Sequence, residues 1–140
     1  MKYKLVDNGQ INKTIIKVVG VGGCGGNAID HMVSNGVEGV ETISANTDSQ
    51  ALLKNKATEK IILGELNNHG QGAGGKPDVG RDTALDDYER LTTMFEGANM
   101  VFIAAGMGGG TGTGAAPIVA RAAKEVGALA VAIVTKPMSL

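Results

Sequence analysis

The chain has 140 residues, of which 43% are hydrophobic and 19% are charged, and its net charge at pH 7 is −1. This size and composition predict one globular domain, and the charge balance excludes a nucleic-acid binder that depends on phosphate-backbone contacts. The single cysteine, Cys24, excludes an internal disulfide framework, and no apolar stretch reaches the ~20 residues of a membrane-spanning helix. We therefore expect a cytoplasmic protein that does not insert into a membrane.

The first elements of the chain surround a glycine-rich turn. Residues 1–13 are polar and aperiodic, and we expect a flexible arm there, ahead of a domain at 14–140. The domain begins with an apolar, β-branched strand at 14–19, which the glycine run 20–26 closes. The apolar spacing that follows predicts a helix over 27–35.

The rest of the chain alternates between strand and helix patterns. Short runs rich in β-branched and other apolar residues predict strands at 40–46, 60–63, 100–105 and 129–135. Helical spacing and start signals predict helices at 48–55, 77–95 and 111–126. In the helix at 77–95 the expected core residues are Ala84, Leu85, Tyr88, Leu91 and Phe95. The acidic residues expected on its solvated face are Asp82, Asp86, Asp87 and Glu89.

Strands that are joined by helices run parallel, with right-handed crossovers. The pattern therefore predicts an open, doubly wound α/β sheet with strand order 3-2-1-4-5. In this order the first and fourth strands lie side by side where the winding reverses. Ligands in such folds bind outside the carboxyl ends of the strands at that point, and a glycine-rich loop follows each of these two strands.

The loop at 108–114 is the strongest functional signal, with five glycines and two threonines between a strand and a helix. Glycine loses more backbone freedom on folding than other residues, so such a run is expected where a ligand approaches the main chain closely. Beside a helix N-terminus, it predicts a phosphate-binding loop. Neither glycine loop contains Lys or Arg, so main-chain amides, two helix N-termini and a bound cation would meet the phosphate charge. Asn27 and Thr111 could donate to an oxygen, or serve only as helix caps.

Two other patterns leave alternatives open. The G-x-G-x-x-G pattern that starts at Gly20 fits a dinucleotide site, but the second strand ends in Asn46 rather than an acidic residue, so an NAD or FAD oxidoreductase is the weaker interpretation. The segment 70–76 satisfies G-x-x-x-x-G-K, yet Pro77 follows where a P-loop needs Ser or Thr. That segment is a lid over a nucleotide or a plain surface loop. The scattered His and Cys residues show no metal-ligand spacing.

The segment 106–117, with the letters GMGGGTGTGAAP, resembles the signature of the FtsZ family of bacterial cell-division GTPases in the tubulin superfamily. The first glycine loop, the turn at 45–48, the loop at 72–74 and the segment 134–137 are also similar to that family, and the resemblance spans about residue 15 to the end. It implies the N-terminal part of a Rossmann-like GTP-binding domain that stops after the fifth strand.

The resemblance also implies a site for GTP or GDP, with Mg²⁺ held through the phosphates. The residues at 23–27 would contact the diphosphate, those at 110–112 the outer phosphates, and those at 73–74 the region of the γ-phosphate, while Asn46 and Asp48 would line the nucleotide's edge. The implied nucleotide-binding set is Gly22, Gly23, Cys24, Gly25, Gly26, Asn27, Asn46, Asp48, Ala73, Gly74, Gly108, Gly109, Gly110, Thr111 and Gly112. Two residues depart from the family, Cys24 where glycine is usual and Lys76 where asparagine is common.

Members of this family polymerise head to tail into cytoplasmic filaments at the division site, where they meet other cell-division proteins. They hydrolyse GTP between subunits, with an acidic catalytic loop that comes later in the sequence than residue 140. The resemblance therefore implies a chain with the phosphate-binding loops but no catalytic residue, inactive as a GTPase by itself. The alternatives are a fragment of an NAD or FAD oxidoreductase and a non-catalytic fragment that caps filaments.

Overall fold

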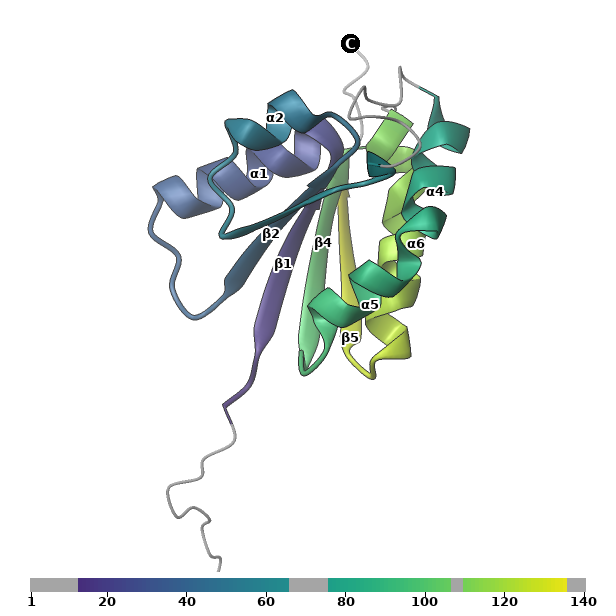
Figure 1. The fold of residues 1–140 in the computed structure, drawn as a ribbon. Helices are drawn as coiled ribbons and strands as arrows, with labels where there is room; N and C mark the ends of the chain where they lie inside the picture. The colour runs from purple at the N-terminus through teal and green to yellow at the C-terminus, as the bar shows by residue number, and fades with distance from the viewer. Residues whose placement is uncertain (1–12, 66–75, 107–109, 136–140) are drawn as a thin grey trace, which may run out of the picture.

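The sheet has the predicted strand order. The structure, a computed structural model, describes residues 13–65, 76–106 and 110–135. Within them, parallel strands form a five-stranded sheet in the order β3-β2-β1-β4-β5 (Figure 1). The strands are β1 (Ile16–Val21), β2 (Glu41–Asn46), β3 (Glu59–Ile62), β4 (Met100–Gly106) and β5 (Leu129–Thr135).

Helices cover both faces of this sheet, as a doubly wound fold requires. On one face lie α1 (Gly22–Ser34) and α2 (Ser49–Leu53). On the other face lie α4 (Pro77–Asp86), α5 (Tyr88–Phe95) and α6 (Gly110–Glu125), as Figure 1 shows. None of the helices within the described residues is long and apolar enough to cross a bilayer.

The two helix layers bury unequal amounts of apolar side chain. Alternate residues of the strands point to opposite faces, so Val19 and Val21 of β1 belong to one core cluster and Val18 to another. The larger cluster, between the sheet and α4–α6, includes fully buried Phe95 and Val119. The smaller cluster, on the face of α1, consists of Val18, Ile29 and Ala57, with partly buried Met32, Val40 and Phe102 packed against it.

The first helix begins at Gly22, so the prediction of a start at residue 27 was wrong. Most of the glycine run forms the first turn of α1 instead of a loop. The reason is tertiary packing: a Cβ at Gly20 would clash with the carbonyl oxygen of Gly25, and a Cβ at Gly25 would clash with that of Ala104 on β4. These glycines let the helix backbone rest directly on β1 and β4, which outweighs glycine's poor helix propensity.

The helix predicted over 77–95 is broken at Asp87 into α4 and α5, and this residue is buried rather than solvated. Its carboxylate accepts a hydrogen bond from the Gly64 amide at 2.6 Å and another from the Arg90 guanidinium at 3.1 Å. Asp87 therefore connects the helix break to the turn that follows β3. Among the predicted core residues, Leu85 was also misplaced, since 40% of its surface is exposed.

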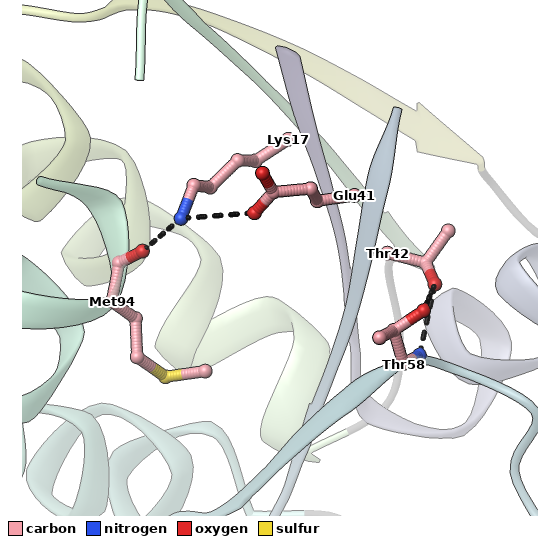
Figure 2. A network of polar contacts seen from close by, with 5 residues as sticks. All are labelled: Lys17, Glu41, Thr42, Thr58 and Met94. Carbon is pink, nitrogen blue, oxygen red and sulfur yellow. Dashed lines mark hydrogen bonds and ion pairs between the residues drawn. The ribbon is translucent and has the colours of Figure 1, made fainter. Parts of the chain in front are cut away.

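A buried lysine attaches α5 to the sheet (Figure 2). Lys17 of β1 donates from Nζ to the carbonyl oxygen of Met94 at 2.6 Å and lies 3.3 Å from a carboxylate oxygen of Glu41. The Met94 carbonyl belongs to the last turn of α5, where a positive charge is favourable. The charge of Lys17 thus fixes the C-terminal end of α5 against β1.

Candidate phosphate-binding site

The carboxyl ends of three neighbouring strands lie level with one another. Val21, the last residue of β1, pairs with Ala45 of β2 on one side and Ala105 of β4 on the other. Both α1 and α6 begin at this end of the sheet (Figure 1). The structure therefore places the first glycine-rich segment, and the described part of the second from Gly110 on, where the sequence predicted a ligand.

The starts of α1 and α6 are in main-chain contact. Gly22 has a φ of +77°, and a Cβ there would lie 2.9 Å from the amide nitrogen of Gly112 and 3.3 Å from its Cα. A Cβ at Gly112 would in turn lie 2.9 Å from the carbonyl oxygen of Gly106. Neither position has space for a side chain, so both must be glycine for the starts of α1 and α6 to pack this closely.

These contacts change the interpretation of the glycines. The sequence suggested that they leave room for a ligand, but Gly20, Gly22, Gly25 and Gly112 are required by contacts within the chain. Gly23 is different: it is exposed, and a Cβ there would have no heavy atom of the described residues within 4 Å. Space for a ligand at the first turn of α1 therefore lies at Gly23.

The N-terminus of α1 has no side-chain cap among the described residues. Its N-cap residue is Val21, whose side chain cannot accept a hydrogen bond, and the first turn contains no acidic residue. The first turn of α6 contains no acidic residue either. Both helix starts thus keep the positive end of the helix dipole without a carboxylate of their own first turn to neutralise it.

The turn between β2 and α2 is fixed by its own side chains. The Asn46 side-chain oxygen accepts from the Asp48 amide at 3.2 Å, and the Asp48 carboxylate caps α2 by accepting from the amides of Gln50 and Ala51 at 3.0 and 3.3 Å. Asp48 therefore has a structural role as the N-cap of α2. Asn46 is 7% exposed and lies beside the glycine turn of α1.

A pair of buried hydroxyl groups joins this turn to α6. Thr47 is fully buried, Thr111 is 7% exposed, and their Oγ1 atoms are 2.7 Å apart. Thr47 lies in the family-like turn at 45–48 but was not among the predicted site residues, although its place directly after β2 and beside Asn46 was a usable signal.

A cavity of about 260 Å³ opens beside the glycine turn of α1. The predicted site residues that line it are Gly22, Gly23, Gly26, Asn27 and Asn46. Other polar residues that line it, which sequence reasoning also missed, are Asp30, Ser44, Lys54 and Asn55. A wider cavity of about 620 Å³ lies between β3 and α5, and the predicted site residues are not among those that line it.

Comparison with known proteins identifies the family of the chain. The family model described as "Tubulin/FtsZ family, GTPase domain" matches residues 15–140. The chain belongs to the tubulin/FtsZ family.

Two relatives show how similar the chain is to FtsZ proteins of this family. It is 59% identical over 136 residues to the cell division protein FtsZ of Pseudomonas aeruginosa, covering 96% of this chain and 34% of that protein. It is 56% identical over 128 residues to FtsZ of Buchnera aphidicola subsp. Schizaphis graminum, covering 91% of this chain and 33% of that protein. The chain spans about a third of the length of these curated relatives.

Solved structures of the tubulin/FtsZ family have the same fold. The empty FtsZ dimer of M. jannaschii matches with a TM-score of 0.88 and 46% identity, over 92% of this chain and 38% of that one. CetZ2 from Haloferax volcanii, in a GTPγS-bound protofilament, matches with a TM-score of 0.75 and 25% identity, over 86% of this chain and 39% of that one. The doubly wound sheet predicted from the sequence is thus the fold of this family.

The structure places some residues of the site that the family resemblance implied at the contact between α1 and α6, and others lie outside the described residues. Gly110, Thr111 and Gly112 form the start of α6, next to Gly22. Cys24 is exposed in the first turn of α1, whereas Gly25 is buried against β4. The implied residues outside the described part of the chain are Ala73, Gly74, Gly108 and Gly109.

Proposed function

We propose that this chain binds a guanine nucleotide, GTP or GDP, through its phosphates at the paired starts of α1 and α6. The observation that carries the proposal is the main-chain contact between Gly22 and Gly112, which brings two helix N-termini together at the carboxyl ends of β1 and β4. Each N-terminus acts as roughly half a positive charge and offers unpaired amide donors. Two of them side by side favour a ligand with several negative charges.

We further propose that Mg²⁺ accompanies the nucleotide. Two helix dipoles supply about one unit of positive charge, less than the negative charge of a di- or triphosphate, and a cation would offset the rest. The described residues contain no group of three or more His, Cys, Asp and Glu side chains that could hold a metal ion. The phosphates themselves would therefore supply the ligands of the cation, together with water.

The preference for guanine, and the process that the nucleotide serves, are inferred from the family. The matching family model is described as a GTPase domain, and one similar structure is a GTPγS-bound protofilament. By this likeness we propose that the protein self-associates head to tail into filaments, hydrolyses GTP between subunits, and acts with other division proteins in the cytoplasm at the division site. The alternative of an NAD or FAD oxidoreductase rests only on the G-x-G-x-x-G pattern. That pattern is also part of the first glycine loop, which is similar to the FtsZ family.

A charge placed in the site tests the phosphate proposal. In Gly23→Asp the carboxylate enters open space at the start of α1, where it would repel a phosphate without disturbing the core. The matched control is Ser34→Asp, which adds the same charge at the exposed opposite end of α1. With a fluorescent GDP analogue, we expect Gly23→Asp to weaken binding by about tenfold or more, from like-charge repulsion across a few ångströms, and Ser34→Asp to change it by less than about twofold.

Competition identifies the ligand class in the same assay. Unlabelled GTP and GDP should displace the analogue, and NAD should not. Displacement by NAD as effective as that by GDP would contradict a guanine-nucleotide site. Equal binding by the two aspartate variants would show that phosphates do not lie at the start of α1.

A further inference from the structure

Thr47 is a polar side chain with no surface exposed, at the point where β2 turns into α2. The Oγ1 atom of Thr47 lies 2.7 Å from the Oγ1 atom of Thr111, within hydrogen-bond distance. Burying a hydroxyl group costs free energy unless the group is hydrogen-bonded. The contact therefore links a residue with no expected ligand role to one in the first turn of α6, at the proposed phosphate site.

The backbones on both sides of this contact are held in place. Thr47 lies between Asn46 and Asp48, whose side chains fix the turn by the hydrogen bonds described above. On the other side, Gly80 of α4 packs so closely that a Cβ there would lie 2.8 Å from the Cα of Thr111. With both main chains held in place, the hydroxyl contact restrains the Thr111 side chain.

Either hydroxyl of this contact could be the donor. Each threonine hydroxyl has one hydrogen to donate and two lone pairs to accept. When Thr111 donates to Thr47, its hydrogen is occupied; when Thr47 donates to Thr111, the hydrogen of Thr111 stays available for another acceptor. An anion at the start of α6 favours the second arrangement, because it accepts and cannot donate.

We propose that Thr47 is a positioning residue of the phosphate site: it donates to Thr111 and so directs the Thr111 hydroxyl hydrogen toward a phosphate oxygen. This inference rests on the proposed function, because it assumes that a phosphate binds at the start of α6. It assigns no contact between Thr47 and the nucleotide.

The test compares Thr47→Val, which keeps the shape but removes the hydroxyl, with Thr47→Ser, which keeps the hydroxyl. In Thr47→Val, binding of the fluorescent GDP analogue should weaken by about 2- to 12-fold, which corresponds to the net contribution of one hydrogen bond. In Thr47→Ser, binding should stay within about twofold of that of the unmodified chain. Equal binding by the unmodified chain and Thr47→Val would overturn the inference. If Thr47→Val shows no cooperative urea transition, Thr47→Ala replaces it in the same comparison.

A double-mutant cycle separates positioning from general support of the fold. Thr111→Val should weaken binding by itself, and adding Thr47→Val to it should cause less than about a twofold further loss, because the hydroxyl to be directed is gone. An equal loss in both backgrounds would show that Thr47 supports the fold only, and would overturn the inference. If the unmodified chain fails to bind the analogue, the proposed function itself is wrong, and this inference with it.

Discussion

Two adjacent glycines at the start of α1 should respond in opposite ways to the same substitution. In Gly22→Ala, the left-handed backbone costs an L-residue about 1–2 kcal/mol. The new Cβ would also lie 2.9 Å from the Gly112 amide nitrogen, a main-chain atom that can move only with α6. Overpacking of this kind costs about 1–3 kcal/mol, so we expect a loss of about 2–5 kcal/mol in the free energy of unfolding.

Gly23→Ala is the matched control. The added methyl group enters open space, and alanine is the better helix former by up to about 1 kcal/mol, so the variant should be as stable as the unmodified chain or slightly more stable. Urea unfolding followed by far-ultraviolet circular dichroism measures both variants. With an m-value of about 2 kcal/mol/M, the midpoint of Gly22→Ala should fall by about 1–2.5 M.

Similar midpoints for the two alanine variants would refute the reasoning, because they would show that α1 and α6 are not in the close contact described. A change in the m-value would instead point to an altered unfolded state, and the midpoint comparison would then be replaced by the free energies.

Three further predictions concern contacts away from the site. Asp87→Asn should lower the free energy of unfolding by about 1–3 kcal/mol, because a buried, charge-assisted acceptor is weakened; an unchanged urea midpoint would contradict this. Lys17→Met should cost about 1–3 kcal/mol by leaving a helix carbonyl without its donor, whereas Glu41→Gln, whose side chain is 55% exposed, should stay within about 0.5 kcal/mol. The hydrogen bond from Tyr88 to Glu125 raises the pKa of Tyr88, so its stabilising effect is present below the unfolded pKa of about 10 and is lost as pH rises through the folded pKa. Tyrosinate absorbance, taken as the difference from a Tyr88→Phe variant, should show a midpoint above that of an unfolded chain, and Glu125→Gln should lower it.

The sheet could be predicted from the sequence because its signals are local. Each strand is a short apolar run between turn residues, and the helices between strands determine that the strands are parallel. The position of the candidate ligand site was predicted from that topology alone, since the two glycine loops had to lie at the same edge.

The remaining features depend on contacts between segments that are distant in sequence. Gly25 lies in a helix that packs its backbone against Ala104, and Asp87 is buried where its carboxylate accepts a hydrogen bond from the amide of Gly64. Likewise, the hydroxyl contact between Thr47 and Thr111 becomes apparent only once the strand order, with β1 between β2 and β4, is known. Local propensity carries no information about such pairs.

The free energy needed to open each helix layer away from the sheet should differ between the two layers. The layer of α1 holds the sheet through a small apolar cluster around Ile29, whereas α6 belongs to the large cluster. Regions with less apolar burial open at lower cost, so amide hydrogens of α1 should exchange faster than those of α6. A bound nucleotide that contacts Gly23 in one layer and Thr111 in the other would stabilise both layers against opening. Its binding should therefore slow amide exchange most in α1, and reduce the difference between the two layers.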